Sequence, residues 1–572
     1  KIPQHLHKYI VEQDYDTYTS EDQEVWRFVM RQLQSFLTQN AHEAYEPGLL
    51  DTGISVNEIP RISVMDQKLK AFGWRAVAVS GFIPPAAFME FQSNGILPIA
   101  CDMRSVENIL YTPAPDIVHE AAGHAPILID PEFSKYLKSY AEVASRSIIS
   151  SEDLDLYEAI RKLSDIKESN QSSEHDIKKA EDELNYAVAS MTYVSEAQLL
   201  GRMNWWTAEY GLVGSMDAPK IYGAGLLSSV GEAKTCLEHS VKKIPLSVDC
   251  IEMTYDITEK QPQLFVTPKF DHLHTVLDQL ADKLAYRLGG TEAIERAMAA
   301  ETVNTVELET GLQMSGIVDR VDLDSKGDVC FFHMSGRSQI SRGREQLDGH
   351  GPDYHSHGYS TPIGPIEGFN KPLSSLSQSE QDSLNIKVGA EISLNFTSGI
   401  KVKGRLKGFS RHEDRLDILS FENCTVSKGD EFMFQPDWGV FDLACGGQIT
   451  SVYAGPADRL VFEVEEDFVA SRVPSRTTSP KEQQLYGVFQ KIRGLQGQEN
   501  IIEEDFDSLV KEWSSNTDKN WLAGLELYEI ALQRKIEGAN VNEIAKSFEA
   551  IKDPSVKTCL EDGLDLVKSE IN

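Results

Sequence analysis

Cysteine is scarce in this sequence, and none of it is arranged in a metal-binding or redox pair. The 572 residues contain seven cysteines, an odd number with no C-x-x-C spacing. This pattern excludes a small disulfide-stapled scaffold and is typical of a protein from a reducing compartment. We therefore expect seven inert thiols and a cytoplasmic location.

Basic residues are also few compared with acidic ones. Lys and Arg number 55 against 89 Asp and Glu, and the formal net charge is -34. Because nucleic-acid binding depends on clustered Lys and Arg, this balance argues against a nucleic-acid partner. No run of about 18 apolar residues is present, so we expect no membrane span. The first residues, Lys-Ile-Pro-Gln-His, lack the apolar segment of a signal peptide.

The chain is longer than the roughly 250 to 300 residues at which one hydrophobic core stops growing, so we expect a multidomain protein. Residues 1–300 have mainly helical periodicity and predict a mainly α domain. Residues 310–470 change to a period of two and predict a small β-rich domain. Residues 480–572 return to helical spacing and predict a C-terminal helical region.

Two finer expectations concern the mainly α domain. A charged helical hairpin insertion is predicted at about 151–186, and its second helix is expected to run on as far as Glu209. Residues 270–300 predict one further amphipathic helix.

Two metal-capable imidazoles lie close together in this domain. His119 and His124 stand in the segment Pro113-Ala-Pro-Asp-Ile-Val-His119-Glu-Ala-Ala-Gly-His124. Glu209, in the helical segment Trp205-Trp-Thr-Ala-Glu209, offers a third ligand. Two imidazoles and one carboxylate with open coordination positions form the ligand set of non-haem Fe(II) oxygenases rather than of closed structural zinc sites.

The spacing of the two histidines leaves other interpretations open. Residues five apart lie about 140° from each other around an α-helix. The two histidines of a zinc peptidase, in the motif H-E-x-x-H, are four residues apart and lie on one face. We expect Gly123 to let the backbone relax at a helix end before His124, so that the two imidazoles can occupy adjacent corners of an octahedron. Glu120 is placed like the base of a zinc peptidase, so a hydrolase is one alternative. A second alternative is that the two histidines bind no metal.

Four separated segments resemble the pterin-dependent aromatic amino acid hydroxylases, the family of phenylalanine, tyrosine and tryptophan hydroxylases. The resemblance covers about the first 290 residues and implies that family's mainly α catalytic fold. The segments, in order, are Tyr111 to Pro126, Trp205 to Gly211, Tyr222 to Ser229 and Tyr255 to Pro262. It also implies a monooxygenase that uses O2, Fe(II) and a tetrahydropterin such as tetrahydrobiopterin to hydroxylate an aromatic ring.

The resemblance also assigns roles to single residues. It implies that the iron ligands are His119, His124 and Glu209. Glu120 matches a carboxylate near the pterin, which we include among the catalytic residues. The implied cofactor loop contains Gly81, Ile83 and Phe88, and a phenylalanine gains offset stacking on a flat heteroaromatic ring.

The implied amino acid pocket is built around one arginine. Arg104 matches the residue that holds the substrate carboxylate, a bidentate role that suits a guanidinium, and Asp116 would orient it. Asp116 is also a reasonable helix N-cap. The remaining pocket positions are Thr112, Pro113, Trp205, Gly225, Ser228 and Ile257.

Some positions depart from the animal enzymes of this family. Pro98 stands where a histidine near the pterin is usual, and Pro85 replaces a serine of the pterin loop. Ala114 replaces a glutamate and Asn204 a tyrosine. No regulatory domain of the family's type precedes the resemblance, so we do not expect substrate activation through one.

Two positions favour phenylalanine as the substrate. Ile257 occupies a position where tyrosine hydroxylases have an aspartate, and Trp205 stands where tryptophan hydroxylases have a phenylalanine. One such change in an apolar pocket shifts preference by only ~1 to 3 kcal/mol. Tryptophan, another aromatic substrate, and a non-catalytic binding protein that keeps the fold are the alternatives.

The C-terminal half has no recognisable catalytic motif. A loop with His350, His355 and His357 predicts either a second metal site or a solvated loop. We expect residues 310–572 to serve assembly, regulation or partner binding, including homo-oligomer formation.

Overall fold

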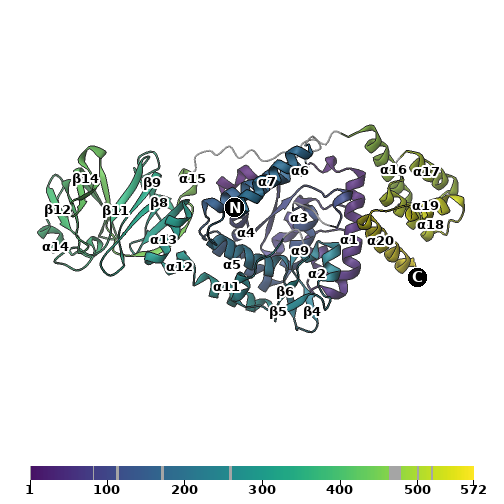
Figure 1. Ribbon diagram of the computed structural model, residues 1–572, viewed down its shortest axis with the longest axis horizontal. Coiled ribbons are helices and arrows are strands. Elements are labelled where there is room, and N and C mark those ends of the chain that lie inside the picture. The colour runs from purple at the N-terminus through teal and green to yellow at the C-terminus, as the bar shows by residue number, and fades with distance from the viewer. Residues whose placement is uncertain are drawn as a thin grey trace.

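The computed structural model describes residues 2–81, 83–110, 115–168, 173–256, 260–462, 478–498, 501–516 and 519–571. A helical part lies in the middle of the molecule, with the β-rich part at one end and the C-terminal helices at the other (Figure 1). Among these residues, no helix is long and apolar enough to cross a lipid bilayer.

The central part begins with a long, well-capped helix, α1 (Ser20–Asn40). Thr19 forms a capping box with Asp22, the local signal that starts the helix. Asp130 caps α5 (Pro131–Ala144) by accepting from the backbone N–H groups of Glu132 and Phe133, and a proline stands in the first turn. The other helices of this part are α2 (Tyr45–Thr52), α3 (Ile62–Leu69), α4 (Pro85–Ser93), α8 (Glu196–Asn204), α9 (Ala224–Leu227) and α10 (Val230–Thr235).

Two small sheets complete the central part. Strands β1 (Arg75–Val79) and β2 (Ile96–Ala100) form a parallel pair. A second sheet has the order β4-β3-β6-β5. Its strands are β3 (Leu212–Gly214), β4 (Pro219–Ile221), β5 (Lys242–Pro245) and β6 (Gln263–Thr267). Short 3-10 helices connect these and later elements, at Gln4–Tyr9, Tyr15–Thr17, Lys70–Phe72, Val106–Asn108, Pro126–Ile129, Val248–Glu252, Leu373–Ser375 and Pro436–Trp438.

The charged segment forms a hairpin of α6 (Ser151–Glu168) and α7 (Glu174–Ser190). The expectation that the second helix continues to Glu209 is wrong, because α7 ends at Ser190. There, the backbone N–H and hydroxyl of Thr192 donate to Glu152 on α6. Ser195 then accepts from the backbone of Gln198 and starts α8 as a new helix.

Residues 270–300 form three helices rather than one. They are α11 (Phe270–Ala281), α12 (Ala285–Leu288) and α13 (Gly290–Ala300). Gly289 separates the last two with a φ of +60°, and a Cβ there would lie 2.7 Å from the carbonyl oxygen of Ile449. The apolar periodicity continues through this break because all three helices face buried cores.

The β-rich part contains two antiparallel sheets with separate cores. The first has the order β10-β9-β8-β7-β17, with β11 also paired to β9. Its strands are β7 (Val303–Leu308), β8 (Leu312–Leu323), β9 (Val329–Arg342), β10 (Glu345–Gln346), β11 (Gly358–Pro362) and β17 (Ile449–Ala454). A turn at Lys326-Gly327 joins β8 to β9, and Gly327 has a positive φ of 88°.

The second sheet follows the order β12-β13-β14-β15, with β16 paired to β14. Its strands are β12 (Glu391–Asn395), β13 (Ile400–His412), β14 (Arg415–Lys428), β15 (Glu431–Phe434) and β16 (Phe441–Ala444). The backbone N–H of Ala444 donates to the hydroxyl of Thr361, so β16 and β11 connect the two sheets. Two short helices, α14 (Gln378–Ser383) and α15 (Arg459–Phe462), flank this part.

The C-terminal helices pack against α1, at the far side of the central part from the β-rich part (Figure 1). Phe28 on α1 makes an edge contact with Trp521, and a Cβ on Gly563 would lie 2.5 Å from Leu525. These helices therefore share one hydrophobic core with the central part. They are α16 (Pro480–Gln496), α17 (Glu503–Asn516), α18 (Trp521–Arg534), α19 (Ala539–Glu549) and α20 (Pro554–Ile571).

Candidate functional site

His119 and His124 lie on a π-helix, η5 (Val118–His124). The i→i+5 hydrogen bonds of a π-helix place residues five apart on one face. The expectation of a relaxed helix end at Gly123 is therefore wrong, because the winding of η5 itself aligns the two histidines. Gly123 has another function: a Cβ there would lie 2.6 Å from the carbonyl oxygen of Ala224, so the glycine lets α9 pack closely.

Glu209 ends a second π-helix, η7 (Trp205–Glu209). Its Oε2 lies 3.3 Å from Nε2 of His119, and its Oε1 lies 3.4 Å from Nε2 of His124. One ligand atom from each of the three residues lies within 4.8 Å of the other two. Two short π-helices thus bring together the three residues that the sequence singles out as metal ligands.

Glycines let the chain approach Glu209 closely. A Cβ on Gly223 would lie 2.4 Å from the carbonyl oxygen of Glu209, and one on Gly225 would lie 2.7 Å from the ring of Tyr210. The predicted pocket residue Gly225 is therefore needed for packing against η7.

Ser228 holds the ring of His119 in place. Its hydroxyl lies 2.7 Å from the carbonyl oxygen of Ala224 and 3.0 Å from Nδ1 of His119. Because the single hydroxyl proton is donated to the carbonyl, the oxygen accepts from Nδ1–H of the ring. With Nδ1 engaged in this way, Nε2 is the nitrogen that faces Glu209 and is the one available to a metal ion.

Two carboxylates near the histidines have opposite pKa shifts. Burial raises the pKa of Glu209, but the imidazoles of His124 and His119 outweigh it and hold that pKa well below its usual range. Burial raises the pKa of Glu120 to about 8, since the opposing charge of His124 is too weak to offset it. Oε2 of Glu120 is buried and has no hydrogen-bond partner within the described ranges. A polar ligand beside it would satisfy this oxygen.

Arg104 and Asp116 form a buried bidentate pair. Nε and Nη2 of Arg104 donate to the two oxygens of Asp116 at 2.7 and 2.8 Å. Among the described residues, Nη1 has only two long contacts, at 3.4 Å, to the carbonyl oxygens of Ile109 and Ser228. Nη1 is therefore the part of the guanidinium that can hold a substrate carboxylate. Burial raises the pKa of Asp116, but the charge of Arg104 outweighs it, so the net shift is downward.

Trp205 lies in an aromatic stack that the sequence analysis did not foresee. Its ring stacks on Tyr210 at 4.4 Å and on Tyr255 at 4.3 Å between centroids. Since both faces are covered, Trp205 can present only an edge to a bound ring. The two tyrosines could have been suspected only from their closeness in sequence to Glu209 and Ile257.

The predicted cofactor loop follows β1. Gly81 has a φ of +61°, and its backbone N–H donates to the carboxylate of Asp102 at 3.2 Å. The carbonyl of Asp102 accepts from the backbone of Ile117, next to η5. Asp102 therefore links the loop to the histidine helix, and the sequence analysis missed it. Ile83 is buried, and Phe88 on α4 is half-buried.

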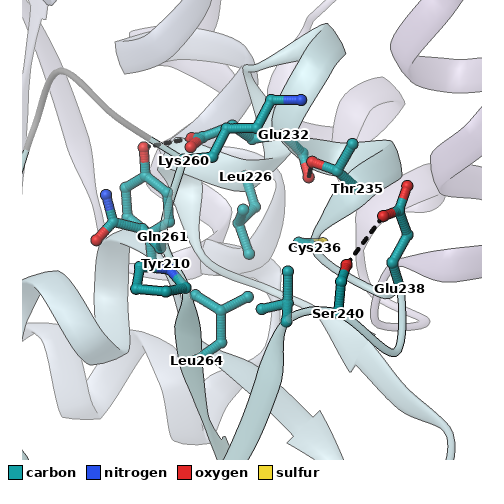
Figure 2. A pocket seen from close by; sticks show the side chains of 12 residues that line it. Tyr210, Leu226, Glu232, Thr235, Cys236, Glu238, Ser240, Lys260, Gln261 and Leu264 are labelled. Atoms are coloured by element: carbon teal, nitrogen blue, oxygen red, sulfur yellow. Dashed lines mark hydrogen bonds between the residues drawn. The ribbon is translucent and has the colours of Figure 1, made fainter.

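Three predicted pocket residues, Thr112, Pro113 and Ile257, lie outside the described residues. A cavity of about 230 Å³ lies beside Tyr210 and Leu226 (Figure 2). Its wall includes Glu232, which accepts from the hydroxyl of Tyr210 at 2.6 Å. Of the predicted site residues that the structure describes, none lines this cavity.

Comparison with known proteins identifies relatives of the central part. Residues 7–166 and 177–308 match the family model of the biopterin-dependent aromatic amino acid hydroxylases. The unmatched residues 167–176 include the last residues of α6 and the first residues of α7.

Individual relatives match over the same part of the chain. A phenylalanine-4-hydroxylase of Mesorhizobium japonicum is 29% identical over 278 residues, which are 48% of this chain and 84% of that protein. One of Chromobacterium violaceum is 26% identical over 291 residues, 48% of this chain and 82% of the relative. The solved structure of phenylalanine hydroxylase from Chromobacterium violaceum with iron and phenylalanine bound is 25% identical. It covers 49% of this chain and 89% of that one, with a TM-score of 0.37.

Proposed function

This chain belongs to the biopterin-dependent aromatic amino acid hydroxylases, and we propose that it converts phenylalanine to tyrosine. The observation that carries the proposal is the grouping of His119, His124 and Glu209 within 4.8 Å at the ends of two π-helices. Relatives named phenylalanine-4-hydroxylase, such as that of Mesorhizobium japonicum, support the choice of substrate. The residue types at Ile257 and Trp205 also favour phenylalanine as the substrate.

The donor set fits Fe(II). His119 and His124 offer nitrogen and Glu209 offers oxygen, the 2-His-1-carboxylate set that leaves coordination positions open. The hydrogen bond from His119 to Ser228 keeps one lone pair directed at the centre. When bound, iron and a tetrahydropterin supply the electrons that reduce O2, one atom of which enters the substrate ring.

The residues of the chain provide binding and orientation. Nη1 of Arg104 would hold the carboxylate of the amino acid, while Asp116 keeps the guanidinium in place. Thr112, Pro113, Gly225, Ser228 and the edge of Trp205 would surround the rest of the substrate. The pterin would bind between Phe88 and Glu120 beside the loop at Gly81 and Ile83, and the unpaired oxygen of Glu120 supports this placement.

The rest of the chain has a proposed accessory role. We infer three units, residues 1–300, 310–470 and 480–572, of which the last two serve assembly or regulation. Homo-oligomer formation through the C-terminal helices would appear in light scattering as a mass above that of one chain. Seven free cysteines support a cytoplasmic location.

A turnover assay tests the activity. The full chain is supplied with O2, tetrahydrobiopterin and, in turn, phenylalanine, tyrosine or tryptophan, before and after removal of iron by a chelator. We expect tyrosine from phenylalanine, loss of activity without iron, and recovery on addition of Fe(II). Hydroxylation of tryptophan alone would contradict the substrate. No pterin oxidation with any of the three would indicate a binding protein.

A further inference from the structure

A second group of potential metal ligands lies in the β-rich part, in cores separate from that of the first group. We call His350, His355 and Asp442 the β-part cluster. His350 and His355 lie between β10 and β11, and Asp442 lies on β16 of the other sheet. The cluster therefore joins the two sheets, at the opposite end of the molecule from the C-terminal helices (Figure 1).

The spacing of its ligand atoms suits one metal ion. Nδ1 of His350 lies 3.2 Å from Nε2 of His355, and all three ligand atoms lie within 4.8 Å of one another. Zinc–nitrogen bonds of about 2.0 to 2.1 Å at tetrahedral angles place two nitrogens about 3.3 Å apart. The two histidines are thus already at the separation that a tetrahedral ion requires.

Asp442 has an oxygen without a partner. The side chain is 4% exposed, and Oδ1 accepts from the hydroxyl of Ser420 at 2.5 Å. Oδ2 is buried and has no hydrogen-bond partner in the described part of the chain. An unpaired carboxylate oxygen is costly to bury, and a cation beside it would remove that cost.

The backbone holds the two histidines in place. The carbonyl oxygen of His350 accepts from Ile340 and that of His355 accepts from Ser338, both at 3.0 Å. Both donors lie on β9, so the loop is anchored to the first sheet. The ring of Tyr359 on β11 contacts His355 edge-on and restricts it further. Such support is what a preorganised ligand needs.

We propose that His350, His355 and Asp442 bind a divalent transition-metal ion such as zinc, with solvent in the remaining coordination position, and that this ion cross-links the two sheets. Two imidazoles and one carboxylate favour zinc over calcium or magnesium, which prefer all-oxygen sites. His357 takes no part, because it is exposed and outside the cluster. Without a metal, the same geometry would be a hydrogen bond between two rings beside an unsatisfied carboxylate.

The test uses the full chain with both His119 and His124 changed to Gln, so that zinc cannot bind at the first group. After chelation and dialysis against zinc, elemental analysis should find one zinc per chain. Asp442→Asn and His355→Gln in that background should each weaken zinc binding more than tenfold. His357→Gln, the matched control, should leave it unchanged.

Two results would overturn the proposal. One is a background protein that binds no zinc at tenfold molar excess, and the other is equal zinc binding by the Asp442→Asn and His357→Gln proteins. Cobalt(II) binding to the background protein provides a measurement that does not depend on how the Asp442→Asn and His355→Gln proteins fold. The background protein should show the visible absorption of four-coordinate cobalt with imidazole ligands, and its absence would equally reject the site.

Discussion

Arg104 and Asp116 are joined by two parallel hydrogen bonds, and the same carboxylate also holds the backbone of His119. Oδ1 of Asp116 accepts from the backbone N–H of His119 at 3.1 Å, the contact that an N-cap residue makes. Arg104 is 5% exposed and Asp116 is 2% exposed. One buried carboxylate therefore positions both the proposed substrate anchor and a proposed iron ligand.

Asp116→Asn should impair substrate binding and iron binding together. An amide can accept at only one atom, so Arg104 loses one of its two bonds and is left a buried charge. Breaking such a pair costs roughly 3 to 5 kcal/mol, and we expect kcat/KM for phenylalanine to fall at least 100-fold. Steady-state kinetics and iron analysis measure the two effects. Glu107→Gln, on the surface nearby, is the control, and unchanged KM in Asp116→Asn would contradict the assignment.

Ser228→Ala should lower iron affinity without unfolding the protein. The variant loses the acceptor for Nδ1–H of His119, so the ring is free to rotate and to exchange its proton between nitrogens. Loss of such a partner typically costs 10–100-fold in metal affinity. Iron titration of the chelated protein measures it. Ser229→Ala removes only the cap of α10 and should keep the parent affinity; equal affinities in the two variants would be inconsistent with the role of Ser228.

The grouping of the proposed ligand residues could be predicted from the sequence, but its geometry could not. The residue types of His119, His124 and Glu209 and the family resemblance were enough to predict that the three side chains meet. The i→i+5 winding that aligns the histidines depends on tertiary contacts, such as the packing of α9 on Gly123. Apolar periodicity carries no signal for a π-helix, so the spacing was interpreted as an α-helix end.

The ends of two helices, at Ser190 and at Gly289, could not be predicted from the sequence for a related reason. The pattern of apolar residues continues across Gly289, since the helices on both sides face buried cores. It also continues across Ser190, although Tyr186 and Val188 before the break are exposed. What ends α7 is a contact of Thr192 with Glu152, 40 residues away in sequence. In the β-rich part, His350 and His355 were singled out as part of a histidine-rich loop, whereas Asp442 is about 90 residues further along and joins them only through sheet packing.

Gly123→Ala should destabilise the site through packing. The new Cβ would lie 2.6 Å from the backbone oxygen of Ala224, so η5 and α9 must move apart. Such overpacking costs about 1 to 3 kcal/mol, and we expect a lower Tm and weaker iron binding. Gly231→Ala on α10 is the matched control, because no atom lies within 4 Å of its Cβ. If both variants melt at the parent temperature, the close approach is not essential.

Trp205→Phe should broaden the substrate range toward tryptophan. The smaller ring leaves space between Tyr210 and Tyr255, into which a bulkier substrate can extend. Changes of this size in an apolar pocket alter preference by ~1 to 3 kcal/mol. We expect the ratio of kcat/KM for tryptophan to that for phenylalanine to rise about tenfold or more. The same kinetics on Trp206→Phe, whose ring is fully buried, separate a pocket effect from a general loss of packing.

A cluster of buried ion pairs connects the C-terminal helices to α1. Arg27 pairs with Glu526 at 2.5 Å and with Glu529 at 3.3 Å, and Arg31 pairs with Glu529 at 2.7 Å. Glu526 is 1% exposed. Burial raises the pKa of Glu526 to about 8, and the charges of Glu24 and Glu529 add to this against that of Arg27.

The attachment of these helices should therefore weaken as pH rises from about 4.5 to 8. In that range the folded protein keeps a proton on Glu526 that the unfolded chain has released, so the free energy of unfolding falls with pH. One group contributes at most about 1.4 kcal/mol per pH unit. Urea unfolding at pH 5, 6.5 and 8, followed by tryptophan fluorescence, should show the decline in the parent and a flatter profile in Glu526→Gln. Glu570→Gln, which removes a half-exposed partner of Arg31, should keep the slope of the parent. A slope that survives in Glu526→Gln would assign the pH dependence to another group.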